Sequence, residues 1–478
     1  MRLLLAATLA ALAALAFAGC AADTPPLPSL PVTLQPEGFA DALHLPQAED
    51  LNPAGDVVEV NLEARPAELE VLPGTRSSLW TYNGQFPGPM LRARKGDRLV
   101  VHFKNSLPAP TSIHWHGVRV PNAMDGSELT QAAVAPGESF TYEFTLLDAG
   151  TYWYHPHVDS SAQVGFGLFG ALVVDDPEET ALPDDVTLMF TDISLKPDGT
   201  LAPGNESGWF GDYFGREGDV ALVNGKVQPT LKARAGVPQR WRVINASRAR
   251  YWKFKVPRAT VWRIGGDGGL IPRPLPIGEV VLTPGERAEL WVRPEEENTG
   301  PVPVLWQDSD RFHVQSQRKP EQFMQFDTID APRLEPGLSA PPAALRTIDA
   351  LDATGAITRS VKFGEKAGPT GTTVLTINGL TASESTPWMA RVGDTELWEL
   401  ENETSYDHPF HLHGFSFQVL EVDRSPWPVR EWKDTVNLVP RQKVRFLVRW
   451  DDRPGMWMFH CHILDHVALG MMAMLHLH

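Results

Sequence analysis

Cysteine is nearly absent from this chain of 478 residues, which contains only Cys20 and Cys461, so a framework of several disulfides is excluded. Basic residues are in the minority, with 42 Lys and Arg against 59 Asp and Glu. The formal charge of −17 repels phosphate backbones and anionic lipid head groups, which excludes nucleic acid as a partner. The apolar run at residues 3–18 is shorter than the ~20 residues that span a bilayer.

The amino terminus has the composition of an export signal. Arg2 precedes the apolar run and small residues surround Cys20, so we expect residues 1–20 to be a signal peptide. Residues 17–20, Phe-Ala-Gly-Cys, resemble a bacterial lipobox with phenylalanine in place of leucine, which would put a lipid anchor on Cys20. The alternative is plain cleavage after residues 16–18. Residues 21–54, rich in Pro, Ala and Asp, would follow as a tether or a wrapping arm.

The rest of the chain has the pattern of β-strands. Its 39 Gly and 42 Pro separate short alternating runs such as RLVVHFKN at 98–105 and KVRFLVRW at 443–450. Stretches with a helical period are scarce. Because the length suits about three domains of roughly 150 residues, the sequence predicts an all-β chain of consecutive sandwiches.

A repeated spacing relates the first and last thirds of the chain. Gly96 precedes His114 of HWHG by eighteen positions, and Gly393 precedes His411 of HLHG by the same number. Gly150 is followed at five and seven positions by His155 and His157, as Gly455 is by His460 and His462. At the corresponding positions the middle third has Phe254, Leu305 and Gln307, so we expect it to be a spacer without metal.

The four His-x-His pairs predict a metal centre. Residues i and i+2 of a strand point to the same face, so each pair presents two imidazoles side by side. The pairs use eight of the 15 histidines, too many for one ion, since nitrogen sites of this kind use about four ligands. Imidazole ligands suit Cu, Zn, Fe or Ni. We therefore expect two or three ions between the first and last domains.

Cys461 belongs to a different site. It lies between His460 and His462, and strand alternation turns it to the opposite face. His466 and Met471 follow it, and His408 has the matching odd offset from His411. A ligand set of two His, one Cys and a weak Met is that of a blue-copper electron-transfer site, and it is unsuited to structural zinc.

Four segments of the chain resemble the copper motifs of the multicopper oxidases, the family of laccases and bacterial copper-efflux oxidases. They are HWHG, HPH, HPFHLHG and HCHILDHVALGM, in that order. The resemblance covers about residues 55–478 and implies three consecutive cupredoxin-like Greek-key β-sandwich domains, which we place at 55–178, 179–345 and 346–478. It implies four copper ions, with the type 1 copper in the third domain.

The resemblance also implies a role for each ligand. The type 1 copper would take His408, Cys461, His466 and Met471. The type 2 copper would take His114 and His411. One type 3 copper would take His116, His155 and His462, and the other His157, His413 and His460; this split is less firmly implied than membership of the cluster.

The chemistry implied is the four-electron reduction of dioxygen to water, with electrons entering through Cys461. Because this reaction consumes protons, we expect nearby acids: Asp125 matches an acidic position of bacterial members, and Asp465 stands where glutamate is more usual. A turn aspartate and a solvated carboxylate are the respective alternatives.

The electron donor is less visible in the sequence. Methionine as axial ligand implies a modest potential, which suits phenols and Cu(I), and the scattered methionines form no methionine-rich insert. We therefore expect a laccase-type phenol oxidase, with a cuprous or metal-ion oxidase of periplasmic copper tolerance as the alternative and a non-enzymatic copper-binding protein as a minor one. We expect an exported monomer in the periplasm or cell envelope, touching a membrane only through a lipid on Cys20.

Overall fold

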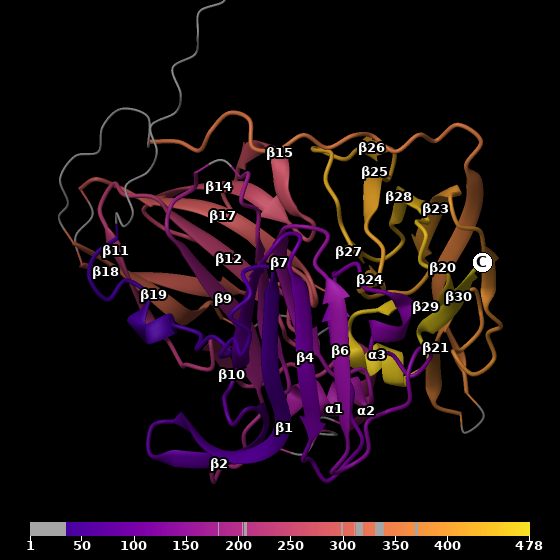
Figure 1. Ribbon diagram of the computed structural model, residues 1–478, viewed down its shortest axis with the longest axis horizontal. Coiled ribbons are helices and arrows are strands. Elements are labelled where there is room, and N and C mark those ends of the chain that lie inside the picture. Colours follow the sequence, from indigo (N-terminus) through magenta and orange to yellow (C-terminus); the bar gives the residue numbers. More distant parts are fainter. Residues whose placement is uncertain are drawn as a thin grey trace, which may run out of the picture.

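The computed structural model describes residues 35–179, 181–202, 204, 208–297, 300–309, 311, 319–329, 339–368 and 371–478. The expected signal peptide, with Cys20, lies outside these residues. Strands dominate the described chain and form six sheets that are paired into three sandwiches (Figure 1). The predicted all-β fold of three consecutive sandwiches is therefore confirmed.

One sheet of each sandwich repeats the same order of strands. In the first sandwich the order is β2 (Thr75–Tyr82), β1 (Val57–Leu72), β4 (Arg98–Asn105), β6 (Ser139–Thr145). In the second it is β10 (Val220–Val223), β9 (Asp185–Ile193), β12 (Gln239–Asn245), β17 (Arg287–Pro294), β14 (Ala259–Gly266), β15 (Gly269–Pro276). In the third it is β21 (Thr373–Ile377), β20 (Ile357–Ala367), β23 (Thr395–Asn402), β28 (Lys443–Arg449), β25 (Phe417–Val422), β26 (Ser425–Pro426). In each of these sheets the first strand of the order pairs antiparallel with the second. The second strand then pairs in parallel with the third.

The other sheet of each sandwich is repeated in the same way. In the first sandwich its order is β3 (Gly88–Arg94), β8 (Gly170–Asp175), β7 (Gly150–His155), β5 (His114–His116). In the second it is β11 (Thr230–Arg234), β19 (Glu321–Ile329), β18 (Gly300–Gln307), β13 (Trp252–Lys255), β16 (Val280–Leu282). In the third it is β22 (Trp388–Ala390), β30 (Met472–Leu477), β29 (Gly455–Cys461), β24 (His408–Leu412), β27 (Thr435–Leu438). Strands β13 and β18 thus occupy the places of the histidine-bearing strands, and Phe254 and Trp306 pair across them.

Three Asn-Gly turns follow the same strand in each sandwich. Asn83, Asn224 and Asn378 all have positive φ, as do the glycines after them. Both central residues of a type I′ turn need this backbone conformation, which Asn and Gly adopt at least cost. The backbone N–H of each Asn donates to the neighbouring strand, to Glu63, Met189 and Lys362 respectively. The repeat read from sequence is thus a repeat of fold units.

Each sandwich buries a core of its own. In β23 every second residue of TELWELEN is buried, which is the pattern of a strand with one face on a core. Large aromatic side chains, including Trp115, Trp241 and Trp398, are fully buried in the first, second and third cores respectively. At about 25 cal/mol per Å² of apolar surface, burial of such side chains supplies the main driving force for each unit.

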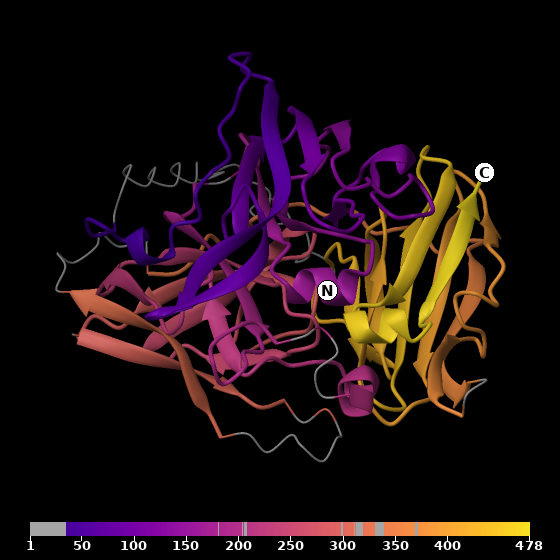
Figure 2. The same cartoon turned by 90° about the horizontal axis from the view of Figure 1, so that it is seen from below.

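Three short helices lie where the sandwiches meet: α1 (Ser160–Gly165), α2 (Gly208–Phe214) and α3 (Leu464–Ala468). Figure 1 shows them side by side, and Figure 2 shows the second and third sandwiches on either side with the first above their junction. Leu464 of α3, Val164 of α1 and Ile244 at the end of β12 share one buried cluster. Apolar packing therefore fixes the three units around this junction.

Residues 35–54, expected as part of a tether or arm, run along the first two sandwiches. Leu43 packs into the second core, Leu45 is buried at the junction, and Gln47 forms a bridge with Met90. None of the described helices is long and apolar enough to cross a membrane.

Candidate metal centre

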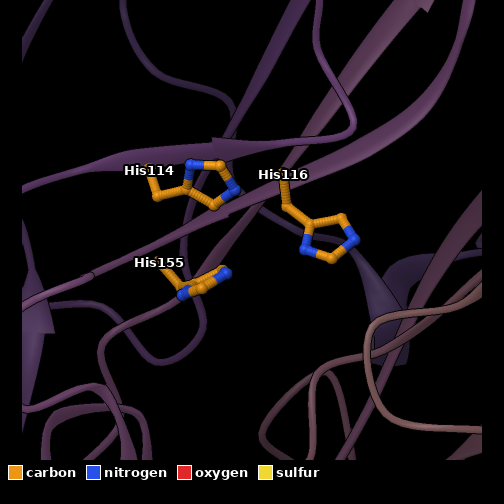
Figure 3. Close-up of side chains that lie close together, drawn as sticks. All are labelled: His114, His116 and His155. Atoms are coloured by element: carbon orange, nitrogen blue, oxygen red, sulfur yellow. The ribbon is translucent and has the colours of Figure 1, made fainter. Parts of the chain in front are cut away.

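The structure brings together the eight histidines of the His-x-His pairs. Antiparallel pairing sets His114 of β5 opposite His155 of β7, and His411 of β24 opposite His460 of β29. The first and the third sandwich therefore each carry two neighbouring pairs on one sheet face. Figure 3 shows three of the imidazoles, those of His114, His116 and His155, lying close together.

The two halves of the histidine cluster meet across the junction of the first and third sandwiches. The ring centroids of His114 and His413 are 3.8 Å apart, and those of His116 and His411 are also 3.8 Å apart. Nε2 of His413 lies 3.1 Å from Nε2 of His460. The third sandwich supplies the contact between His413 and His460 by itself, whereas the two ring contacts need both sandwiches.

The protonation of the histidines is suited to metal binding. Burial is the largest influence on these imidazoles and lowers the pKa of His116, His155, His157 (to about 3), His408, His411, His413, His460, His462 and His466 (to about 3). They are therefore neutral at neutral pH and keep a nitrogen lone pair. Neutral imidazole is the form that binds a metal.

Backbone carbonyls fix which nitrogen carries the proton in four of the rings. In each of these rings Nδ1 lies close to a main-chain carbonyl oxygen. The partner of His114 is Asp125 at 2.8 Å, that of His155 is Pro156 at 3.0 Å, that of His411 is Asp434 at 3.0 Å and that of His460 is Cys461 at 2.7 Å. A carbonyl oxygen can only accept, so Nδ1 must donate and Nε2 is left with its lone pair. Hydrogen bonds of this kind orient the histidine ligands of metal sites.

Several of these lone pairs have no protein partner. Nε2 of His114, His155 and His411, and both ring nitrogens of His462, are buried without a hydrogen bond among the described residues. Burying a polar group without a partner costs about 1–3 kcal/mol. A cluster of such unpaired nitrogens therefore needs another explanation. Borderline cations such as copper fit this nitrogen-only donor set.

The site around Cys461 lies on the opposite face of β29. The Cys461 Sγ lies 3.5 Å from Nδ1 of His408 and 3.4 Å from Nδ1 of His466, and these two nitrogens are 3.2 Å apart. All three side chains are buried. Burial raises the pKa of the Cys461 thiol, so a thiolate there would need a cation to stabilise it.

Met471 is held beside this site by its backbone. Its N–H donates to the carbonyl of His466 at 3.0 Å, and its carbonyl accepts from the N–H of Cys461 at 3.2 Å. The Met471 side chain is fully buried in the third core. The Met471 backbone thus lies next to both His466 and Cys461, and its role as a weak axial ligand stays a prediction.

Asp125 lies directly behind the histidine cluster. Its Oδ2 is 3.0 Å from Nδ1 of His413, and its Oδ1 is 3.4 Å from Nδ1 of His114. Burial alone would raise the pKa of Asp125, but the two imidazoles outweigh it and hold the pKa well below its usual range. The carboxylate is therefore within reach of the cluster, as a proton donor or acceptor would need to be.

Asp465 has a different environment, buried between arginines of the second sandwich. Its Oδ1 accepts from Ser161 Oγ at 2.6 Å, from Arg216 Nη1 at 2.6 Å and from Arg248 Nη2 at 3.0 Å, and its Oδ2 accepts from the Arg216 N–H at 2.8 Å. Burial opposes ionisation, but Arg248, Ser161 and Arg216 lower the pKa of Asp465. Its carboxylate is thus engaged in an ion pair, and its role in proton delivery stays a prediction.

Asp434 is a residue of the site that the sequence did not predict. Its Oδ1 lies 3.1 Å from Nε2 of His116, and it is bound by both Nη atoms of Arg287 from the second sandwich, at 2.8 and 2.5 Å. Thr435, which pairs with His411, places Asp434 there. No local motif marks this aspartate; only the pairing of β27 with β24 could have found it. The middle sandwich, expected as a spacer, therefore supplies part of the wall.

Comparison with known proteins gives one family. Family models described as multicopper oxidase match residues 63–179 and 354–476. Multicopper oxidase MmcO of Mycobacterium tuberculosis is 30% identical, with 87% of this chain and 86% of that protein covered. A laccase of Bacillus subtilis is 28% identical, covering 91% and 98%. The structure of a Campylobacter jejuni multicopper oxidase, described as a metallo-oxidase, aligns with a TM-score of 0.82 at 28% identity, covering 91% and 94%.

Proposed function

We propose that this chain is a laccase-type oxidase of phenolic donors. The chain belongs to the multicopper oxidase family and is a copper-dependent oxidoreductase with dioxygen as acceptor. The observation that carries the proposal is the pair of adjoining sites on β29, one built on Cys461 and one on histidines from two sandwiches. One strand thereby joins a site for single electrons to a site where several can be used.

The proposed ligands divide into four sets, one for each copper. The type 1 set is His408, Cys461, His466 and Met471; the type 2 set is His114 and His411; the type 3 sets are His116, His155, His462 and His157, His413, His460. The close groups His408–Cys461–His466 and His157–His413–His460 support two of these sets directly. Copper held by these residues would supply one-electron oxidation of a donor at the first site and four-electron reduction of dioxygen at the others.

The protein supplies proton transfer and exclusion of water. We propose that Asp125 passes protons to the oxygen-reducing site, because its carboxylate lies close to His413 and His114 and, among the described residues, to no arginine. Asp434 orients His116 and His411 and is kept ionised by Arg287. Full burial of the histidines keeps the site dry, which strengthens every electrostatic interaction in it.

The second candidate function is oxidation of Cu(I) or another metal ion in copper tolerance. The description of the Campylobacter jejuni relative as a metallo-oxidase favours it. Oxygen uptake by the copper-loaded protein with 2,6-dimethoxyphenol, compared with Cu(I), tests the choice. We expect faster uptake with the phenol. No uptake with any donor, despite four bound coppers, would leave the minor alternative of a copper-binding protein.

The cell location and assembly state are also proposals. The expected signal at residues 1–20 supports export to the periplasm or cell envelope, with Cys20 as the expected lipid anchor. All proposed ligands come from one chain, which supports a monomer.

A further inference from the structure

A cavity of about 210 Å³ lies where all three sandwiches meet. Tyr152 of β7 lines it from the first sandwich and Gly268 from the second. The third sandwich contributes Phe415, Trp432 and Arg449. Among the described residues that line the cavity there is no proposed copper ligand, so it is separate from both metal sites.

Four charged groups at this cavity cancel in pairs. Arg119 binds Asp148 with two N–H groups, and the distance from its Nη2 to Oδ1 is 2.9 Å. Asp451 accepts from Nε and Nη2 of Arg453 at 2.7 and 2.8 Å. These two ion pairs are complete and bring no net charge to the cavity.

Two further arginines give the cavity its positive charge. Arg346 donates from Nη1 to the carbonyl of Gly268 at 2.7 Å, and Arg449 is the exposed last residue of β28. Neither guanidinium has a carboxylate partner among the described residues. The chain has 59 Asp and Glu against 42 Lys and Arg, so carboxylates are plentiful. The cavity is therefore a positive site in an acidic protein, and such a site attracts anions.

Aromatic side chains form much of the remaining wall. Tyr152 and Phe415 are buried, and Trp432 is half-buried. In the part of the chain that the structure describes, the Trp432 indole has neither a hydrogen bond nor a ring contact. Ligand pockets typically combine such apolar walls with a few charged groups. A cavity of about 150 Å³ can hold a benzene ring, so this one has room for a ring with one small substituent.

We propose that this cavity binds a small aromatic monocarboxylate of the benzoate type, with its ring against Trp432 and its carboxylate on Arg346 and Arg449. The inference goes beyond the proposed function and does not depend on it. Arg346 uses one of its N–H groups on Gly268, which fixes the guanidinium and leaves the others for a ligand. A planar guanidinium binds a carboxylate through two parallel N–H···O bonds. A small inorganic anion would leave the aromatic wall uncovered.

A ligand in this cavity would contact all three sandwiches at once. Tyr152 in the wall has its ring 5.9 Å from Cζ of Arg287, and Arg287 binds Asp434 beside the histidine cluster. The cavity wall is thus connected to the wall of the cluster. Because the cavity exists only while the sandwiches are docked, a ligand that binds there stabilises the docked form by mass action.

Calorimetric titration of the copper-loaded protein tests the ligand class. Benzoate is compared with benzamide, which has the same ring without the charge, and with acetate, which has the charge without the ring. We expect benzoate to bind about tenfold or more tightly than either compound. Equal binding of benzoate and benzamide would overturn the proposal. Binding of acetate as tightly as benzoate, as expected of a carboxylate on a bound metal ion, would also overturn it.

Variants of one exposed arginine test the location. Arg449→Gln should lose the preference for benzoate over benzamide, and Arg449→Lys, which keeps the charge but not the planar fork, should keep part of it. Arg391→Gln removes the same charge from an exposed arginine of the same sandwich outside the cavity, and it should bind benzoate like the wild type. An unchanged preference in Arg449→Gln, or an equal loss in Arg391→Gln, would refute the site.

Scanning calorimetry tests the contact with all three sandwiches. At a benzoate concentration of about 100 times Kd, the Tm of the wild type should rise by about 5 °C, and that of Arg449→Gln should not. Without benzoate the two proteins should have the same Tm, because Arg449 is exposed and has no carboxylate partner among the described residues. A wild-type Tm that benzoate leaves unchanged would contradict binding to the docked form.

Discussion

Replacing Asp465 by Asn separates its two conceivable roles, ion pairing and proton delivery. The carboxylate is 1% exposed and lies between Arg216 and Arg248, each 7% exposed. Removing one partner of a buried ion pair costs about 3–5 kcal/mol. Arg216 keeps Asp212 and Arg248 keeps the carbonyl of Gly204, so neither guanidinium is left bare and we expect about 2–3 kcal/mol.

The expected loss is measurable as a melting temperature. For an unfolding unit of 150–250 residues, 1 kcal/mol corresponds to about 2–4 °C, so Asp465→Asn should lower the Tm of the third sandwich by about 5–10 °C. Scanning calorimetry of the copper-free protein measures this, with Asp452→Asn, an exposed aspartate of the same sandwich, as the control.

The stabilisation by Asp465 also depends on pH. The folded pKa of Asp465 is lowered, so the stabilisation is complete above the unfolded pKa of about 4 and is lost as pH falls through the folded value.

A Tm within about 1 °C of the wild type would refute the ion-pair reasoning. The proton-delivery role has a separate readout in the pH dependence of oxygen reduction. If Asp465→Asn leaves the Tm unchanged but slows oxygen reduction at high pH, where protons are scarce, Asp465 acts as a proton donor and the ion pair is secondary.

Four further predictions follow from the site. Cys461→Ser should abolish the blue absorption expected of a Cu(II)–thiolate at roughly 600 nm and should abolish all donor oxidation. Three coppers should stay bound, which metal analysis would measure. Surviving activity would contradict the assignment. Asp434→Asn should weaken copper binding to the histidine cluster by about 10–100-fold, measured by chelator competition, because Nε2 of His116 loses its carboxylate partner; equal affinity would argue against that role. Asp125→Asn should slow oxygen reduction by about 10²-fold or more with four coppers retained, measured by single-turnover reoxidation; an unchanged rate would exclude proton transfer through this group. In the copper-free protein burial lowers the pKa of the histidines in the folded state, so the unfolded chain binds more protons. The free energy of unfolding should therefore be highest above the unfolded pKa of about 6.5 and should fall as the pH drops below it. A free energy of unfolding that stays constant from pH 7 to pH 5 would contradict their burial.

The histidine cluster could be predicted from sequence because strand parity is a local property. His-x-His puts two rings on one face of any strand, and the equal spacing of His114 from Gly96 and of His411 from Gly393 marks equivalent strands. The odd position of Cys461 between His460 and His462 follows from the same rule. These arguments need no knowledge of how the sandwiches pack.

The walls of the site could not be predicted because they depend on that packing. Asp434 reaches His116 only because the first and third sandwiches meet, and Arg287 reaches Asp434 only because the second closes on both. The sequence predicts proton delivery by Asp465, which stays a prediction, but it does not reveal the arginine partners of this carboxylate, which lie in the second sandwich. The cover of His466 by Tyr213 has no local sequence signal for the same reason.

The distribution of the histidines along the chain also governs when copper can be held. His114 is made early, whereas His460 and His462 lie close to the carboxyl end, and the two groups touch only after the sandwiches dock. A truncated or half-folded chain cannot close the cluster around an ion, and metal bound by such a chain would be bound weakly. We therefore expect the whole histidine cluster to hold copper only after the first and third sandwiches have docked.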